Sequence, residues 1–160
     1  MNIRPLESAD FDIISPVIDD WWGGRPVRAL LPRLFFEHFN SSSFALVDEA
    51  SLAGFLIGFR SQTLTSVGYV HFLGIRPDVR ARGYGRLLYE RFFSVASGLG
   101  CTEVRAITSP INESSIRFHQ RLGFRILPGD GEVAGFPVSM DHGGPGQPRV
   151  LFSRPLVAKP

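Results

Sequence analysis

Cysteine and lysine are nearly absent from this sequence of 160 residues. Cys101 is the single cysteine, so an internal disulfide and a cysteine-based metal cluster are excluded, and we expect no metal. Lysine occurs once, at Lys159, among seventeen basic residues. Because the net charge is only +2, the composition does not indicate a nucleic-acid partner.

Long apolar runs are also missing. The sequence has no stretch of about eighteen apolar residues, the length that a membrane-spanning helix needs. The N-terminal residues 1–5 lack the hydrophobic region of a signal peptide. We therefore expect a cytoplasmic protein with no membrane partner, and the length favours a single domain over residues 1–160.

The sequence is organised around residues 69–88, which read as strand, loop and helix. Residues 69–75 are β-branched and aromatic, and Arg76-Pro77 ends the run because proline cannot donate to a sheet ladder. A helix is expected from about Gly85. Its apolar residues recur with the helical period, which predicts a core face made of Leu88, Phe92, Val95 and Leu99.

The loop between this strand and helix combines two arginines, Arg80 and Arg82, with two glycines, Gly83 and Gly85. The first amides of a helix lack intrahelical partners and attract anions, and glycine lets a phosphate approach the backbone. Neither a dinucleotide-binding motif nor a P-loop fits, since position 88 is leucine and Gly-Lys-Ser/Thr is absent. An ordinary turn with a glycine at the helix entry is the alternative interpretation.

The remaining segments alternate between strand and helix patterns. Further strands are expected at residues 2–6, 44–47, 52–59, 102–108, 124–127 and 150–153, with brief pairing at 136–140 inside a Gly- and Pro-rich segment, 128–149. The second and third strands flank a polar turn at 48–51 and predict a hairpin.

Three more helices are expected. Ser8 or Asp10 is predicted to cap a first helix that reaches Trp21 and is ended or bent by Pro16. A second is predicted at 27–39, with Leu30, Leu34 and Phe35 facing inward. Pro110 is predicted to open a third, which Gly123 ends, with a core face made of Ile111, Ser115, Phe118 and Leu122.

Two motifs in this order carry a family resemblance. Residues 80–85 resemble the Arg/Gln-x-x-Gly-x-Gly/Ala signature of the GNAT superfamily of N-acetyltransferases. Residues 112–124 resemble the second signature of that family, roughly Asn-x-x-Ala/Ser-x-x-Phe/Leu-Tyr-x-x-x-Gly-Phe, except that His119 stands where many relatives have tyrosine. The resemblance implies an α/β (α+β) GNAT fold, with a mixed, mostly antiparallel sheet of six to seven strands flanked by helices and splayed centrally for the cofactor.

The resemblance also implies the cosubstrate, acetyl-CoA, and the groups that bind it. The first signature would hold the pyrophosphate, the end of the central strand would pair with pantetheine, and two residues of the second signature would lie along the cofactor's other side. These residues are Leu73, Gly74, Ile75, Arg80, Ala81, Arg82, Gly83, Tyr84, Gly85, Arg86, Asn112 and Ser115.

Three residues are candidates for proton transfer. In the family the residue at position 119 protonates the departing thiolate, so His119 is either that acid or a residue that only lines the groove. Tyr69 and His71 alternate onto one face of the central strand. His71 is the candidate base for the amine, with a structural strand histidine as the alternative.

Of the expected ligands, the acceptor amine is the one whose binding residues the sequence indicates least clearly. In relatives the first two helices and the last hairpin hold it, which points to Asp20, Trp21, Trp22 and Asp141. A cationic amine against tryptophan and carboxylate is one interpretation; tryptophans in a core or interface are the other. Carboxylates such as Asp19 and Asp20 at a helix C-terminus oppose the macrodipole, so they either mark an earlier helix end or have another purpose.

The sequence thus predicts direct transfer of an acetyl group from acetyl-CoA to a primary amine, without a covalent enzyme intermediate. A small-molecule amine is favoured. A peptide or protein acetyltransferase is one alternative and a non-catalytic acyl-CoA-binding module is another. A homodimer is left open.

Overall fold

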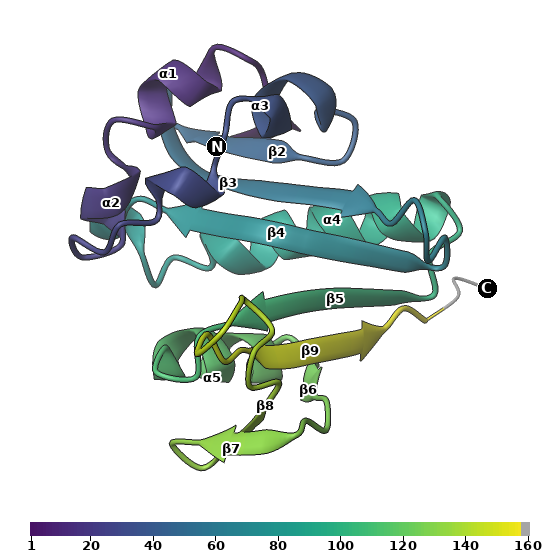
Figure 1. Ribbon diagram of the computed structural model, residues 1–160. Coiled ribbons are helices and arrows are strands. Elements are labelled where there is room, and N and C mark those ends of the chain that lie inside the picture. The colour runs from purple at the N-terminus through teal and green to yellow at the C-terminus, as the bar shows by residue number, and fades with distance from the viewer. Residues whose placement is uncertain (158–160) are drawn as a thin grey trace. The chain divides into compact units, whose positions relative to one another are not determined.

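A computed structural model describes residues 1–157 of the chain, which forms two compact units (Figure 1). Unit 1 contains Met1–Arg60 and Val70–Leu99, and unit 2 contains Ser61–Tyr69 and residues 100–157. Strand β4 (Val67–Ile75) begins in unit 2 and continues into unit 1. Within residues 1–157, none of the helices is both long and apolar enough to cross a bilayer.

The main sheet has seven strands in the order β1-β2-β3-β4-β5-β9-β6. The strands β1–β2, β2–β3, β5–β9 and β6–β9 pair antiparallel, whereas β4 and β5 pair parallel. This confirms the predicted mixed, mostly antiparallel sheet. The splay at its centre stays a prediction.

In unit 1 the strands are β1 (Asn2–Pro5), β2 (Phe44–Asp48), β3 (Ser51–Arg60) and the later part of β4. The predicted hairpin is confirmed, because Asp48 pairs with Ser51 across a two-residue turn. Both turn residues, Glu49 (φ +47°) and Ala50 (φ +63°), have the positive φ that the tight hairpin turn needs.

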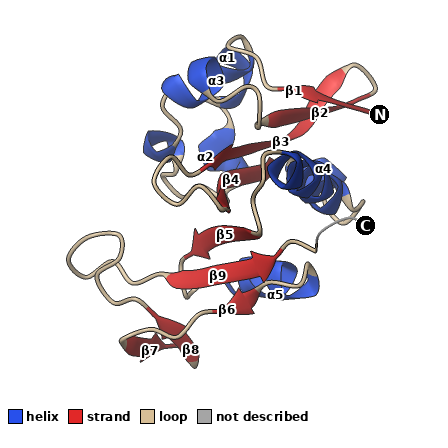
Figure 2. Ribbon diagram, turned by 90° about the vertical axis from the view of Figure 1, so that its right-hand side faces the viewer, coloured by secondary structure: helices blue, strands red, loops and turns tan. Residues whose placement is uncertain are grey.

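Helices cover both faces of the unit 1 strands (Figure 2). Helix α4 (Tyr84–Gly98) lies on one face, and α1 (Asp10–Ile14), α2 (Ile18–Trp21) and α3 (Leu34–His38) lie on the other. Helix α4 approaches β3 closely at Gly58, where a Cβ atom would lie 2.4 Å from the ring of Phe92. The core under α1–α3 is aromatic and aliphatic, and includes Ile14, Ile18, Trp21, Leu31, Phe36, Phe55, Ile57 and Phe72.

The N-terminal helices differ from the prediction. The chain between β1 and Trp21 forms two short helices separated at residues 15–17, where Pro16 lies, and neither predicted cap bonds to the helix: the N-cap of α1 is Ala9. The carboxylate of Asp10 instead accepts two hydrogen bonds of 2.8 Å from the guanidinium of Arg4.

The prediction of one continuous helix at 27–39 was wrong. Residues Arg28–Leu30 form the 3-10 helix η1 and Leu34–His38 form α3, with Pro32 between them. Leu30 is 53% exposed and Leu34 is 47% exposed, whereas the neighbouring Leu31 and Phe36 are buried. The physical reason is the break at Pro32, because it changes the phase that a continuous helix would have kept.

Two other predicted core residues also lie outside the core. Leu88 and Phe92 are buried as expected, but Leu99 follows the last turn of α4 and is exposed. Ile111 is exposed because the helix that Pro110 was predicted to open begins only at Glu113.

Unit 2 contains β5 (Glu103–Thr108), α5 (Glu113–Arg121), β6 (Arg125–Ile126) and β9 (Val150–Pro155). Gly123 has φ +88° directly after α5, which confirms the predicted glycine stop. Between β6 and β9, the strands β7 (Gly131–Val133) and β8 (Phe136–Val138) form a separate two-stranded sheet, so the predicted brief pairing is confirmed.

Candidate functional site

The loop before α4 gives unit 1 an accessible helix N-terminus. Gly83 is the N-cap of α4 and adopts the left-handed conformation, with φ +81°. A Cβ atom at Gly83 would meet nothing within 4 Å. The positive φ favours glycine here, and the space beside Gly83 is open. Of the next residues Arg86 is exposed, Tyr84 is half-buried and Gly85 is buried, so a ligand can approach the helix N-terminus from the Gly83 side.

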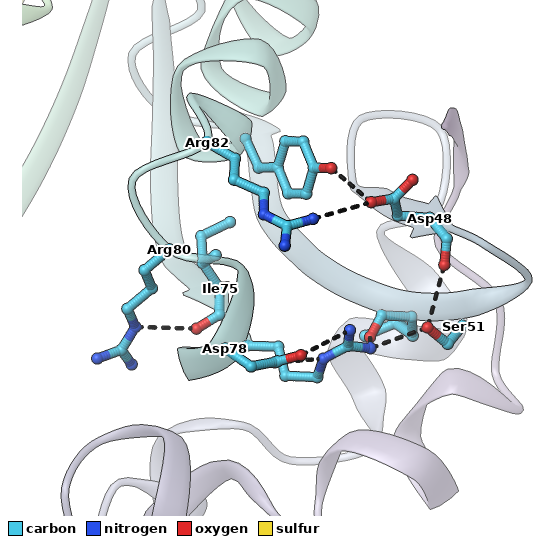
Figure 3. A network of polar contacts seen from close by, with 9 residues as sticks. Asp48, Ser51, Ile75, Asp78, Arg80 and Arg82 are labelled. Atoms are coloured by element: carbon cyan, nitrogen blue, oxygen red, sulfur yellow. Dashed lines mark hydrogen bonds and ion pairs between the residues drawn. The ribbon is translucent and has the colours of Figure 1, made fainter.

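Arg80 shapes this loop. Its Nε donates to the carbonyl of Ile75 at 3.2 Å (Figure 3). Its Nη2 donates to the carbonyl of Trp21. These bonds tie the loop to the end of β4 and to α2. The left-handed backbone of Ala81 (φ +64°) lets the chain turn between this anchor and Gly83.

A carboxylate of the β2–β3 hairpin organises the other side of the loop (Figure 3). Asp48 accepts a hydrogen bond from the Tyr84 hydroxyl and lies 3.8 Å from Nη1 of Arg82. The hydrogen bond to Asp48 raises the pKa of Tyr84 because it stabilises the neutral phenol.

The nearby cations are not equivalent. Arg76 donates to Asp78 at 2.6 Å and also to Ser51 and Leu52, so it fastens the loop to the hairpin. The side chain of Arg82 is 57% exposed, and that of Arg86 is 66% exposed although it pairs with Glu90. Arg82 and Arg86 are therefore the cations best placed in water to meet an anion at the α4 N-terminus.

The residues predicted to meet pantetheine form the end of β4. Leu73 and Ile75 are half-buried on one face of the strand, and Gly74 is buried on the other. A Cβ atom on Gly74 would lie 2.4 Å from the ring of Phe55, so glycine at this position allows β4 to pack against the core.

His71 is held in place by two contacts. Its Nε2 lies 2.6 Å from the carbonyl oxygen of Leu30, and its ring stacks on Phe35 with centroids 4.4 Å apart. A carbonyl oxygen only accepts, so Nε2 must carry the proton. In the neutral ring, Nδ1 is then the atom with a lone pair, and it is the atom that can accept a proton.

Tyr69 belongs to unit 2, at the start of β4, where it pairs in register with Arg105. It is half-buried, as are His71, Leu73 and Ile75 on alternate positions of the strand, which agrees with the expected shared face. Burial raises the pKa of Tyr69, so its phenol stays neutral through neutral pH.

The two polar residues of the second motif shape the start of α5. Asn112 is its N-cap, and Oδ1 of Asn112 accepts from the backbone amide of Ser115 at 3.2 Å. Ser115 is half-buried, and its carbonyl oxygen lies 2.8 Å from Nδ1 of His119. Local structure alone thus gives both residues a role, and their predicted contact with the cofactor stays a prediction.

His119 lies inside unit 2, with 7% of its surface exposed. Its ring stacks on Phe152 of β9, with centroids 4.6 Å apart. Burial lowers the pKa of His119 to about 4. Since Nδ1 donates to the carbonyl of Ser115, the neutral ring has a lone pair rather than a proton at Nε2. This geometry argues against His119 as a proton donor at neutral pH.

The residues predicted to hold the acceptor differ in their surroundings. Trp21 is buried in the core of unit 1. Trp22 is half-buried, and its ring centroid lies 4.6 Å from that of Phe72. Asp20 is exposed at the end of α2. Asp141 lies in unit 2 and accepts from the amide of Gly146 at 2.9 Å. The core interpretation therefore suits Trp21. Of the other three residues, Asp20 and Trp22 share unit 1 with the loop and Asp141 does not.

Sequence reasoning missed Asp48 and the contacts of Asp19. Asp48 was seen only as a turn residue, and nothing local links it to a loop more than thirty residues later. Asp19 was noted as a carboxylate misplaced at a helix end. Its Oδ1 accepts from the amides of Val27 and Arg28, each at 2.9 Å, which supplies the reason for its position.

Known proteins resemble this chain in sequence and in fold. A family model described as the acetyltransferase (GNAT) family matches residues 9–124. A mycothiol acetyltransferase from Gordonia bronchialis is 28% identical over 110 residues, which are 66% of this chain and 36% of that protein. The match thus spans about a third of the curated relative's length.

Solved structures share the fold. Ard1 from Thermoplasma volcanium has a TM-score of 0.77 at 18% identity, covering 98% of this chain and 97% of that one. A diaminobutyrate acetyltransferase from Paenibacillus lautus, in complex with L-2,4-diaminobutyric acid and coenzyme A, has a TM-score of 0.72 at 16% identity, covering 99% and 97%. At these identities the likeness is one of fold.

Proposed function

Because this chain belongs to the acetyltransferase (GNAT) family, we propose that it transfers an acetyl group from acetyl-CoA to a primary amine of a small molecule. The mycothiol and diaminobutyrate acetyltransferases to which it is similar are named for small molecules, and this supports the choice of acceptor. We also propose that residues 1–160 act as one N-acetyltransferase domain.

The observation that carries the proposal is the open N-terminus of α4. Gly83 leaves open space at the start of the helix, and the side chains of Arg82 and Arg86 are mostly exposed to water. Amides, a helix N-terminus and guanidinium groups together suit a pyrophosphate, which carries negative charge on several oxygens. We assign the pyrophosphate of acetyl-CoA to this place.

The chemistry needs one base and no protein nucleophile. The ammonium group of the acceptor loses a proton to Nδ1 of His71, directly or through water, and the amine nitrogen then attacks the thioester carbon. The new C–N bond forms as the C–S bond breaks, the second amine proton leaves as the amide forms, and the thiolate of coenzyme A takes up a proton. General-base assistance of this kind typically contributes about 10²–10⁴-fold to the rate.

We propose that water, rather than His119, protonates the thiolate. The thiol of coenzyme A is a good leaving group, since thiols of this type have a pKa of about 8.5. The stacked, Ser115-bonded ring of His119 supports a structural role for that residue.

A matched set of glycine variants tests the cofactor loop. Gly83→Asp places a carboxylate where the pyrophosphate is assigned, and Gly83→Asn adds a side chain of the same shape without the charge. Two unit charges about 5 Å apart at an effective dielectric constant of about 20 repel by about 3 kcal/mol, or roughly 100-fold in affinity. We expect calorimetry to show Asp binding acetyl-CoA far more weakly than Asn.

The control is Gly100→Asn, because Gly100 also has a positive φ (+85°) and open space around it but lies after α4. It should bind acetyl-CoA as the wild type does. A folded Gly83→Asp protein with unchanged affinity would remove the loop from the cofactor site.

A thiol-release assay with a library of small amines and short peptides tests the reaction. We expect small amines to give the higher kcat/KM. Faster turnover of peptides would transfer the assignment to peptide acetylation, and acetyl-CoA binding without thiol release from any amine would indicate a non-catalytic binding module.

A further inference from the structure

Asp19 joins two segments of unit 1. It lies in α2 and is half-buried, and its Oδ1 accepts from the amides of Val27 and Arg28 at the start of η1, both at 2.9 Å. These amides precede the first intrahelical bonds. The amide of Val27 is shared between Asp19 and the carbonyl of Arg25, 2.9 Å away, and the carboxylate satisfies the amide of Arg28 as a cap does. The carboxylate therefore fixes where η1 begins.

The 3-10 helix η1 transmits this position over one turn. The amide of Leu30 donates to the carbonyl of Val27 at 2.9 Å, and the amide of Leu31 donates to that of Arg28 at 3.0 Å. The carbonyl of Leu30 ends η1 and has no donor within the helix, and it receives Nε2–H of His71. One hydrogen-bonded path therefore runs from the Asp19 carboxylate to the His71 ring.

The other side of the ring is held by packing. Phe35 of α3 stacks on His71 with an interplanar angle of 18°. The stack limits how the ring tilts, but it does not select which nitrogen carries the proton. That selection comes from the Leu30 carbonyl, because only a protonated nitrogen can donate to it.

We propose that Asp19 is a positioning residue for His71. Through η1 it holds the Leu30 carbonyl against Nε2, which keeps the proton on Nε2 and leaves Nδ1 as the basic atom at a fixed place. The catalytic part of this inference rests on the proposed function, in which Nδ1 takes the proton of the amine. The positional part concerns the free protein and can be measured without any substrate.

The first test is the tautomer of His71. Nitrogen NMR of protein labelled in its histidines distinguishes protonated from unprotonated ring nitrogens, and His71→Gln identifies the His71 signals among the four histidines. In the neutral ring of the wild type we expect Nε2 to be the protonated nitrogen. In Asp19→Ala the amide of Arg28 loses the Asp19 acceptor and that of Val27 keeps only the carbonyl of Arg25, so the His71 signals should move toward a mixture of the two tautomers.

Two further variants separate position from charge. Asp19→Asn keeps an oxygen that accepts both amides, so it should retain the wild-type tautomer. Asp19→Glu keeps the charge but moves it by one methylene group, so it should shift the tautomer even if Asp19→Ala does not fold. Asp12→Ala is the control for losing a carboxylate from the same helical layer, since Asp12 is exposed and pairs only with Arg33 among the contacts described.

The second test is kinetic. Misplacing a catalytic group by about 1 Å can cost about 100-fold in rate, so kcat of Asp19→Ala should fall by about 10- to 100-fold. Its KM for acetyl-CoA should not change, because the hydrogen bonds of the Asp19 carboxylate go to Val27 and Arg28 and not to the cofactor loop. The single variant Asp19→Asn should have the kcat of the wild type.

The outcomes are distinct. Identical His71 nitrogen signals in the wild type and in folded Asp19→Ala and Asp19→Glu would overturn the inference. A changed tautomer with unchanged kcat would overturn its catalytic part. Failure of the proposed function has another signature, since the wild type would then release no thiol with any amine while the tautomer shift of Asp19→Ala would still be measurable.

Discussion

Replacing His119 with phenylalanine should slightly lower the free energy of unfolding at pH 8 and should raise it at pH 5, relative to the wild type. The histidine ring already stacks on Phe152 and meets Phe118 and Phe124 edge-on, so another aromatic ring suits the site. What the variant loses is the hydrogen bond from Nδ1 to the Ser115 carbonyl. A bond of this kind contributes about 1 kcal/mol, so the variant should be less stable than the wild type by about that amount at pH 8.

The order should reverse in acid. The pKa of His119 is about 4 in the folded protein, against about 6.5 in an unfolded chain. Below pH 6.5 the unfolded wild type therefore binds more protons than the folded one, and stability is lost as the pH falls toward 4. At pH 5 the loss from this one group is about 2 kcal/mol, which the phenylalanine variant does not suffer. At pH 5 the variant should then be the more stable protein, by about 1 kcal/mol.

Urea midpoints at pH 8 and pH 5 measure this reversal, because the carboxylates that titrate in the same range are common to both proteins. An NMR titration of His119 provides a direct check of its pKa. Parallel pH dependence in the two proteins would refute the reasoning and would place His119 in a more polar environment. The same burial leaves about one imidazolium in a thousand at pH 7, so kcat of His119→Phe should not show the loss that a required general acid would cause.

Three other predictions concern single positions. Asp10→Ala should lower the free energy of unfolding by about 2–3 kcal/mol in a urea titration, because the buried carboxylate accepts two bonds from Arg4, whose side chain is 28% exposed, and one from the amide of Glu7. Gly58→Ala should cost about 1–3 kcal/mol by the same measurement, since its Cβ would meet Phe92 at 2.4 Å. His71→Ala should lower kcat by about 10²–10⁴-fold, most strongly in acid where more of the amine is protonated, with an unchanged KM for acetyl-CoA in steady-state kinetics.

Each stability prediction has a matched control. Asp12→Ala breaks the exposed pair with Arg33 and should cost less than about 1 kcal/mol. Gly98→Ala adds a methyl group at the end of α4, where nothing lies within 4 Å, and should not destabilise the protein. A loss as small for Asp10→Ala as for Asp12→Ala, or as small for Gly58→Ala as for Gly98→Ala, would contradict the packing argument. For His71, wild-type rates in the alanine variant across the pH range would show that the strand histidine is structural.

The sequence predicted those parts of the fold that depend on neighbours along the chain. The period of Leu88 and Phe92 indicated α4, the polar turn after β2 indicated the hairpin, and Gly123 marked the end of α5. Gly83 was predicted at a helix entry because two glycines beside arginines are typical of an anion-binding loop. Each of these features follows from backbone sterics or from a period of a few residues, so a short window contains the information.

Burial required the tertiary structure. Leu30 and Leu34 have large apolar side chains, which are typical of a core, yet they are exposed, and Phe36 is buried instead. A helical phase identifies which residues share a face only while the helix is unbroken, and Pro32 interrupts it. His119 is the clearest case in unit 2, because burial lowers its pKa and no local pattern reports that burial; its ring stacks on Phe152, which is distant in the sequence.

The sequence by itself therefore determined the family, the order of the elements from β2 to β6 and the location of the loop that we assign to pyrophosphate. Only the tertiary structure decided what individual polar groups do. Asp19 looked misplaced at the end of a helix until its carboxylate was found on the amides of Val27 and Arg28, and His71 gained a defined tautomer only from the carbonyl of Leu30, 41 positions away. The physical reason is that backbone conformation is set by neighbours in the chain, whereas burial and hydrogen-bond partners are set by neighbours in space.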